Sequence, residues 1–330
     1  MASSPSGDVA SPAFNGPMPL HDVVPVLIIG AGPIGLLSAV LLNKLGVKSL
    51  IVEKYPQRLT APKAHALGPR ALEILRQAGV DIPSLRQRGT KRSEGRTVSV
   101  VTSLAGQELR QYPYERSDAG ALDVTPELLH NVAQPMTEQH LLEHLGGQVE
   151  IRKGHELVSC VQSPAVVDVT IQERATSKQY IVRANHVVAC DGARSKMRQL
   201  LGIECDEQST PQMLMTIEIS ADLTDLVKHR RRILYNILDP EAHGVLIGYD
   251  LSKKQVLIHG FDVNTHPIST WDEEQCRKLV EIAIGQKVPF TIDSFRPWAL
   301  QSRIAYTYSK GNCFLVGDAA HSFPLALASG

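Results

Sequence analysis

The sequence is poor in cysteine and has no excess of charge of either sign, and each shortage excludes a class of protein. Its five cysteines form no Cys-x-x-Cys pair, which argues against a structural metal or a disulfide framework and favours a reducing compartment. The 34 basic residues balance the 34 acidic ones, so no overall field attracts nucleic acid. No apolar run approaches the roughly 18 residues of a membrane span. We therefore expect a cytoplasmic protein without metal, nucleic acid or membrane span.

The first 22 residues lack the features of a secretory signal. They are rich in Ser, Pro, Gly and Ala, and they contain neither a charged amino-terminal stretch nor an apolar run. We expect residues 1–22 to form a disordered leader.

A strand–helix–strand unit follows. Val23–Ile29 is a continuous apolar run closed by glycine, as in a buried parallel strand. An apolar helix is predicted over Pro33–Leu45 and ends at Gly46, and Val47–Val52 has the pattern of a second strand. This βαβ unit indicates the α/β class.

Helices and strands continue less regularly beyond this unit. Pro69–Ala78 has the pattern of an amphipathic helix, and Thr97–Gln111 alternates as a hairpin does. A further helix is predicted to start at Thr125 and to be interrupted at Pro135. Residues 149–190 have the pattern of a strand meander.

The middle of the chain changes character. Four strands separated by polar turns within 213–262 predict an antiparallel sheet. A helix over 272–284 follows, with a capping box that opens at Thr270. Residues 290–304 return along this sheet, and 313–316 resumes the parallel-strand character.

These patterns predict two interwoven domains. A domain built on the parallel strands would consist of residues 23–92, 126–203 and 305–330. A β-rich domain would consist of residues 93–125 and 204–304.

The turn after the first strand reads GAGPIG, residues 30–35. Gly30 permits a tight turn, Gly32 allows close approach of a pyrophosphate, and Gly35 allows helix and strand to pack closely. Glu53, at the end of the second strand, is placed to accept hydrogen bonds from a ribose. A purely structural glycine turn is the alternative. The context favours a dinucleotide, FAD or NAD rather than NADP, because an acid disfavours a 2′-phosphate.

Two more motifs follow strand ends. Asp191-Gly192 follows an apolar strand, where such a pair is often only a turn. Gly317-Asp318 follows another, where the carboxylate could bind a polyol chain or could simply cap a helix.

Together, in this order and spacing, the three motifs resemble those of class A flavoprotein monooxygenases. These are the FAD-dependent aromatic hydroxylases of the para-hydroxybenzoate hydroxylase and phenol hydroxylase group. The resemblance runs from about residue 23 to Pro324 and is closest to fungal members acting on phenolic or polyketide-derived substrates. It implies a Rossmann-like FAD-binding domain with a parallel sheet, interrupted by an antiparallel β-rich substrate domain.

The resemblance also implies which residues contact the cofactor. Lys63 matches a basic residue of the family that is more often Arg, and Gln139 matches a helical Gln. Asp191-Gly192 would contact both FAD and the nicotinamide donor, and Gly317-Asp318 would hold the ribityl chain. The FAD-binding residues implied in this way are Gly30, Gly32, Pro33, Gly35, Glu53, Lys63, Gln139, Asp191, Gly192, Gly317 and Asp318. The catalytic residue stays unknown.

The implied activity is hydroxylation of a phenolic or polyketide-derived aromatic with O2, in secondary metabolism or aromatic catabolism. NADPH or NADH would reduce FAD transiently, which agrees with a single glycine fingerprint, and a flavin C4a-hydroperoxide would transfer the hydroxyl group. Tyr235, Tyr249 and His259 lie on strands of the insert and could face the substrate; packing in the core or on the sheet surface is the alternative for each. A homodimer is left open.

The sequence departs from the family after Pro324. The family continues there through a glycine-rich loop into a helix beside the flavin, and these are missing, so we expect a carboxyl-terminally shortened member. Without that wall, water would reach the reacting flavin. Three functions stay open: an active monooxygenase, a flavin-binding remnant with little activity, and a flavin dehydrogenase or reductase on the same scaffold.

Overall fold

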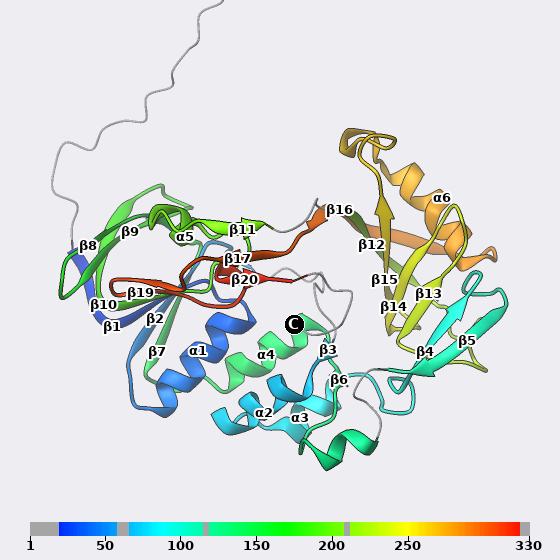
Figure 1. Ribbon diagram of the computed structural model, residues 1–330, viewed down its shortest axis with the longest axis horizontal. Coiled ribbons are helices and arrows are strands. Elements are labelled where there is room, and N and C mark those ends of the chain that lie inside the picture. Colours follow the sequence, from blue (N-terminus) through cyan, green and yellow to red (C-terminus); the bar gives the residue numbers. More distant parts are fainter. Residues whose placement is uncertain (1–19, 58–65, 115–118, 208–211, 324–330) are drawn as a thin grey trace, which may run out of the picture.

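Two large sheets occupy opposite sides of the molecule (Figure 1). The computed structural model describes residues 20–57, 66–114, 119–207 and 212–323. Most of the expected leader lies outside these ranges, but its last residues belong to the first strand, which begins at Leu20. This strand extends further than expected because Leu20 still pairs with Ile181 of a long neighbouring strand.

The first sheet has eight strands, most of them parallel. Its strands are β1 (Leu20–Ile29), β2 (Ser49–Glu53), β7 (Val149–Lys153), β8 (His155–Gln162), β9 (Val167–Glu173), β10 (Gln179–Ala189), β18 (Ser309–Lys310) and β19 (Cys313–Leu315). They are ordered β18-β19-β10-β1-β2-β7, and β8 and β9 form an antiparallel branch on β10. Because β19, β10, β1, β2 and β7 run parallel, their carboxyl ends meet at one edge.

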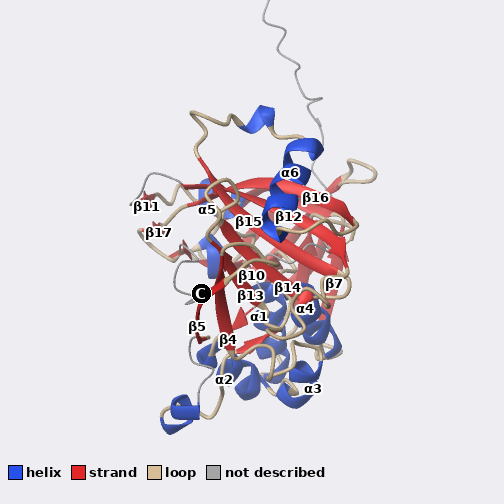
Figure 2. Cartoon of the chain, turned by 90° about the vertical axis from the view of Figure 1, so that its right-hand side faces the viewer, coloured by secondary structure: helices blue, strands red, loops and turns tan. Residues whose placement is uncertain are grey.

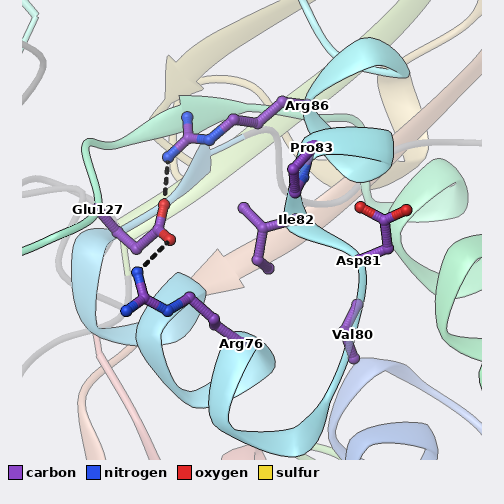
Figure 3. A pocket seen from close by; sticks show the side chains of 7 residues that line it. All are labelled: Arg76, Val80, Asp81, Ile82, Pro83, Arg86 and Glu127. Carbon is purple, nitrogen blue, oxygen red and sulfur yellow. Dashed lines mark hydrogen bonds and ion pairs between the residues drawn. The ribbon is translucent and has the colours of Figure 1, made fainter.

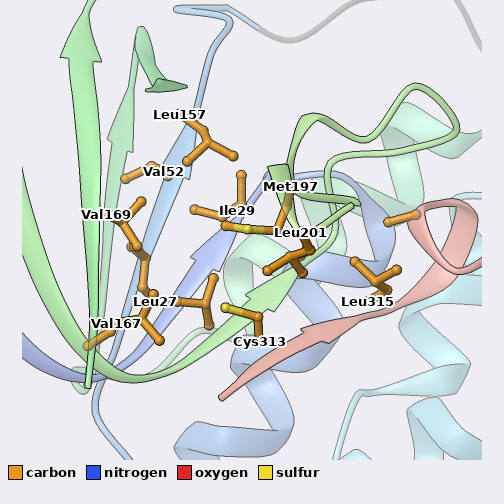
Figure 4. Close-up of a cluster of buried hydrophobic side chains, with 14 of the residues drawn as sticks. Leu27, Ile29, Val52, Leu157, Val167, Val169, Met197, Leu201, Cys313 and Leu315 are labelled. Atoms are coloured by element: carbon orange, nitrogen blue, oxygen red, sulfur yellow. The ribbon is translucent and has the colours of Figure 1, made fainter. Parts of the chain in front are cut away.

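Both faces of this sheet are buried, as a continuous apolar run predicts. Leu27 and Ile29 point into the core shown in Figure 4, together with Met197 of helix α5 (Lys196–Leu200). Val26 and Ile28 point to the other face, where further helices pack. These helices are α1 (Pro33–Lys44), α2 (Pro69–Ala78), α3 (Ile82–Gln87) and α4 (Gln134–Glu143). A two-stranded sheet of β3 (Ala66–Leu67) and β6 (His130–Asn131) lies beside them.

The second sheet has seven strands. They are β4 (Thr97–Val101), β5 (Glu108–Pro113), β12 (Gln212–Ala221), β13 (Leu234–Ile237), β14 (Gly244–Asp250), β15 (Lys254–Phe261) and β16 (Phe290–Leu300), in the order β16-β12-β15-β14-β13-β4-β5. Every neighbouring pair is antiparallel except β13 and β4. The predicted antiparallel sheet is therefore confirmed in its four central strands, and one parallel contact joins them to the predicted hairpin.

The two faces of the second sheet have different neighbours. Helix α6 (Glu273–Ile284) lies across its outer face, as Figure 2 shows, and its Val280 belongs to the same buried cluster as Ile217 of β12. On the other face, Val98 and Ile247 pack with Leu129, which precedes β6. That face is thus turned toward the first sheet and its helices.

A small third sheet lies where the chain passes between the two large ones (Figure 1). Its strands are β11 (Cys205–Glu207), β17 (Arg303–Ala305) and β20 (His321–Ser322). β11 leads into the second sheet and β17 returns from it, so the two passages pair with each other, and β20 pairs with β17. Single helical turns lie at η1 (Ala119–Asp123), η2 (Ile268–Thr270) and η3 (Gly317–Ala319).

One predicted helix start and one predicted helix cap are wrong. No helix begins at Thr125; α4 begins at Gln134, and Pro135 lies in its first turn, where its missing N–H costs no hydrogen bond. The helix predicted over 272–284 is confirmed as α6 (Glu273–Ile284), but its N-cap is Asp272 and not Thr270, since Asp272 Oδ1 accepts from the Gln275 N–H at 2.8 Å.

Candidate dinucleotide site

The three motifs lie side by side at the carboxyl edge of the first sheet. Backbone hydrogen bonds of 2.8–2.9 Å tie each turn to the neighbouring strand: Gly30 N–H to the Val52 carbonyl, Cys190 N–H to the Ile29 carbonyl, and Val316 N–H to the Ala189 carbonyl. Residues separated by nearly three hundred positions therefore form one continuous rim, where ligands of open α/β sheets bind.

The glycine turn forms a cradle whose three glycines have different roles. Gly30 has φ +101°, and a Cβ there would lie 2.5 Å from the Cys190 carbonyl oxygen. A Cβ on Gly35 would lie 2.0 Å from the Gly30 carbonyl oxygen. A Cβ on Gly32 would have no described atom within 4 Å. Packing therefore requires Gly30 and Gly35, whereas Gly32 leaves open space at the start of α1.

The start of α1 is suited to an anion. Gly32 is its N-cap residue, and no described side chain caps it, while Pro33 occupies its first turn. The first N–H groups and the positive end of the helix dipole are therefore available to phosphate.

Glu53 connects β2 to this turn. Its Oε2 accepts from the Ala31 N–H at 2.8 Å, and its Oε1 accepts from the Tyr55 N–H at 2.9 Å. Each carboxylate oxygen has a further lone pair, so Glu53 can hold the glycine turn and accept a ribose hydroxyl at the same time.

The Asp191-Gly192 turn leaves one acceptor without a partner. Gly192 has φ +83°, which glycine adopts without strain. Asp191 Oδ2 accepts from the Met197 N–H at 3.0 Å. Its Oδ1 is buried and has no hydrogen-bond partner among the described residues. Because such atoms are normally paired, the side chain is suited to a ligand donor.

The Gly317-Asp318 turn packs against the start of α1. Gly317 has φ +62°, and a Cβ there would lie 2.9 Å from Ile34 Cγ1. Asp318 follows it and is exposed. A single turn, η3, rather than a longer helix, begins at this position.

Sequence reasoning missed two side chains that join these turns. Arg198 donates to the Ala193 and Ala319 carbonyls, each at 2.8 Å, and Arg303 donates to the Ala193 carbonyl at 3.0 Å. Nothing in the local sequence marks either arginine, because Arg198 and Arg303 donate to carbonyls up to 121 residues away.

The remaining predicted contacts lie elsewhere or outside the described residues. Gln139 is exposed on α4, and its Nε2 donates to Glu143 Oε1 at 3.4 Å. Helix α4 packs against α1, but no hydrogen bond described for Gln139 reaches the three motifs. Lys63 lies outside the described residues.

Two of the three candidates on the insert belong to the core. Tyr235 is fully buried under α6, and its hydroxyl donates to the Arg230 carbonyl at 2.9 Å; burial raises its pKa to about 12. His259 is also buried and contacts the His243 carbonyl through Nδ1 at 2.8 Å, and burial lowers its pKa. For both residues the structure favours packing in the core over facing the substrate.

Tyr249 lies on the opposite face of the same sheet. It packs with Ile247 and Val256 on the side turned toward the first sheet. Burial raises the pKa of its hydroxyl, and the neighbouring Tyr114 and Glu218 raise it further. Of the three candidates, Tyr249 alone faces the nucleotide-binding side of the molecule.

A cavity of about 380 Å³ opens elsewhere, at the corner between α2 and α3 (Figure 3). Its Glu127 is buried and pairs with Arg86 at 2.8 Å and with Arg76 at 3.4 Å. None of its lining residues belongs to the three motifs. Because its buried carboxylate is already paired, we interpret this cluster as support for the α2–α3 corner.

The described residues offer neither a cluster of metal ligands nor a membrane-spanning helix. Among the described residues, no group of three or more His, Cys, Asp or Glu side chains is placed to hold a metal ion. No helix in the described part of the chain is long and apolar enough to cross a membrane.

Fold and site together define an α/β dinucleotide-binding protein with an inserted antiparallel sheet. Residues 23–330 match the family described as FAD binding domain, and the chain belongs to this family. FAD is the cofactor of the family, and the open cradle at Gly32, the carboxylate of Glu53 beside it and the unpartnered oxygen of Asp191 fit it.

Curated relatives are aromatic and polyketide hydroxylases. The chain is 30% identical over 324 residues to tetracenomycin B2 monooxygenase-dioxygenase of Streptomyces olivaceus, covering 93% of this chain and 59% of that protein. It is 27% identical over 313 residues to 2,4-dichlorophenol 6-monooxygenase of Delftia acidovorans, covering 91% and 53%. The chain therefore spans little more than half the length of these relatives.

Solved structures that are similar to this chain also include FAD-bound monooxygenases and hydroxylases. The flavin-dependent monooxygenase PieE in complex with FAD and substrate superposes with a TM-score of 0.85 at 28% identity, covering 93% of this chain and 54% of that one. A ternary complex of aklavinone-11 hydroxylase with FAD and aklavinone gives 0.83 at 26%, covering 92% and 58%. The predicted resemblance to flavoprotein aromatic hydroxylases is confirmed, and the fungal type stays a prediction.

Proposed function

We propose that this chain carries the FAD site of a monooxygenase that hydroxylates a phenolic or polyketide-derived aromatic, in secondary metabolism or aromatic catabolism. The observation that carries the proposal is the meeting of the three motifs around an open cradle, in a chain that belongs to the FAD binding domain family. When bound, FAD would supply the redox chemistry, accepting a hydride from NADPH or NADH and activating O2.

The residues of the cradle would bind and orient the cofactor. The N–H groups at the start of α1 would receive the pyrophosphate beside Gly32, and Glu53 would receive the adenosine ribose. Asp191 would accept a hydrogen bond through Oδ1, and Asp318 would contact the ribityl chain. Lys63 and Gln139 remain proposed contacts by family resemblance.

We also propose the domain division given by the sequence. Residues 23–92, 126–203 and 305–330 would form the FAD-binding domain, and residues 93–125 and 204–304 would form the substrate domain. This division is supported by the separate hydrophobic cores of the two large sheets.

The face of the second sheet opposite α6 would hold the aromatic substrate. Thr216 pairs with Ile258 in register, which places both side chains on one face, together with Val245 and Tyr249. Trp298 adds an indole whose Nε1 donates to Thr216 Oγ1 at 2.8 Å. Such a surface is mainly apolar with a few polar groups, as pockets for aromatic ligands are.

The test is a flavin spectrum of the purified chain, followed by NADPH and NADH oxidation on a panel of phenols. We expect a yellow protein that forms a hydroxylated product. A colourless protein that binds no added FAD would contradict the proposal. A yellow protein that oxidises NADPH to NADP+ while reducing O2 to H2O2, without hydroxylated product, would favour the dehydrogenase or remnant alternatives.

We propose a cytoplasmic location as well. All five cysteines are free thiols, which suits a reducing compartment. Cell fractionation would test the location, and size-exclusion chromatography would test the homodimer, which stays a prediction.

A further inference from the structure

One buried arginine joins the two turns that carry the Asp191-Gly192 and Gly317-Asp318 motifs. Arg198 is only 5% exposed. Its Nη1 donates to the Ala319 carbonyl and its Nη2 donates to the Ala193 carbonyl, both at 2.8 Å. Each acceptor lies immediately beyond one motif, so a single guanidinium spans the gap between them.

Two hydrogen bonds fix the short helix that carries this guanidinium. Ser195 is fully buried and caps α5, its Oγ accepting from the Arg198 N–H at 3.0 Å. Asp191 holds the same short helix through the Met197 N–H. The helix that bears Arg198 is therefore fixed by the Asp191-Gly192 turn at its start.

The partners of Arg198 are unusual for a buried cation. No acidic side chain among the described residues pairs with it, and main-chain carbonyls receive its donors. Burying a charge without a countercharge costs free energy, whereas a planar fork can bridge two carbonyls in a fixed geometry. Positioning of the two carbonyls is the function that this geometry serves.

Arg303 is a second arginine at this junction, by which we mean the hydrogen bonds of arginine side chains to the Ala193 and Ala319 carbonyls. Its Nη1 donates to the Ala193 carbonyl at 3.0 Å, and it lies on β17, the strand that returns from the second sheet. The next residues of β17 are tied to the third motif, since the Ala305 N–H donates to the Ala320 carbonyl at 2.8 Å. Both turns are thus connected to the passage between the sheets.

The other half of the site does not use this junction. The glycine turn is held by the bond from Gly30 N–H to the Val52 carbonyl and by the contact of Ala31 N–H with Glu53. These bonds involve neither arginine. A change at Arg198 should therefore alter the flavin half of the site and leave the ADP half intact.

We propose that Arg198, assisted by Arg303, is a positioning residue that sets the spacing of the two flavin-facing turns and links that spacing to the inserted sheet. The inference rests on the proposed FAD site. Neither side chain is assigned a contact with the substrate or the cofactor; Arg198 acts through the carbonyls of Ala193 and Ala319, and Arg303 assists through the carbonyl of Ala193.

The test compares FAD and ADP binding to the full chain. In Arg198→Lys, one ammonium replaces the fork, and we expect the dissociation constant for FAD to rise about 10–100-fold, as for other supporting contacts. The constant for ADP should stay within about twofold, because its half of the site is unchanged. The absorption bands of bound flavin should also shift, which a loss of stability alone would not cause.

Arg194→Lys is the matched control, because Arg194 is exposed in the same turn; it should leave both constants unchanged. Arg303→Lys keeps Arg198 and should weaken FAD binding by a smaller factor, which keeps the test valid if the Arg198 variant does not fold. Equal losses for FAD and ADP, or no loss for FAD in either variant, would overturn the inference. A wild-type chain that binds ADP but no FAD would instead refute the proposed function and the inference with it.

Discussion

The two large sheets differ in whether the turns at the ends of their strands form a binding site. In the eight-stranded sheet, parallel strands end at one edge, and their turns create a site from backbone geometry, glycines and three carboxylates. In the seven-stranded sheet, neighbouring strands are mostly antiparallel, one face is closed by α6, and polar side chains such as Tyr235 are used for packing. Motifs therefore concentrate in the first sheet, and the role of a residue in the second depends on which face it occupies.

The largest effect is expected from Gly35→Ala in the first sheet. The new Cβ would lie 2.0 Å from the Gly30 carbonyl oxygen, and overpacking of this kind should lower the free energy of unfolding by about 3 kcal/mol. Urea denaturation would measure it. Gly147→Ala is the control, since a Cβ there meets no described atom within 4 Å. Equal stability of the two variants would show that the close approach at Gly35 is not required.

Gly32→Val should separate binding from stability. Gly32 has φ −72° in extended backbone, which valine adopts, and its Cβ has open space. Stability should change by about 1 kcal/mol or less, whereas FAD affinity should fall on the order of 100-fold because the pyrophosphate can no longer approach the backbone. Fluorescence titration with FAD would measure the loss. Unchanged FAD affinity would contradict the proposal that the pyrophosphate binds beside Gly32.

Tyr235→Phe should have the opposite effect to Gly32→Val: it should lower stability and leave FAD affinity unchanged. Its hydroxyl accepts from the Arg232 N–H at 2.8 Å and donates to the Arg230 carbonyl at 2.9 Å, so its removal leaves two buried groups unpaired and should cost about 1–3 kcal/mol. FAD affinity should not change. Tyr306→Phe, at a residue that is 71% exposed, should change stability by less than about 0.5 kcal/mol. If Tyr235→Phe weakened FAD binding, the two sheets would be more closely coupled than we describe.

The smallest effect is expected from Asp168→Asn. Arg183 donates to both carboxylate oxygens of Asp168 at 2.7 Å and lowers the pKa of Asp168 from its ordinary 3.8. A lowered folded-state pKa stabilises the folded protein above pH 3.8, and this contribution is lost as the pH falls through the lower folded value. The wild type should therefore be slightly more stable at pH 7, and the difference should vanish in acid. A difference that persists at pH 2 in thermal melts would exclude this pair as its source.

Local pattern predicted the elements of both sheets more fully than the side-chain network. The βαβ unit, the helix over Pro69–Ala78 and the antiparallel strands follow from apolar periodicity and glycine, which act over a few residues. The helix start at Thr125 was predicted wrongly because Thr-Pro is common at helix starts but also occurs in extended segments. Here it precedes the short strand β6. No local signal revealed Arg198, because one of its partners, Ala319, lies 121 residues away in the sequence.

The site itself was predicted in its backbone parts and not in its side-chain links. Positive φ angles at Gly30, Gly192 and Gly317 restrict these positions to glycine, and this restriction is visible in the sequence. The face occupied by Tyr235 or Tyr249 depends on the register of the whole sheet, since a shift of one residue exchanges the faces. Only the folded structure fixes that register.

The order of strands has a consequence for how the protein is synthesised. β10 ends at Ala189, yet its parallel partner β19 begins only at Cys313, so this edge of the first sheet must wait while the ribosome makes β12 to β16, the five later strands of the second sheet. Contacts so distant along the chain form slowly, and an unpaired β10 edge would be exposed in the meantime. The rim that carries the three motifs is therefore completed only after β12 to β16 have been made, and the yield of native protein should depend on prompt folding of these intervening strands.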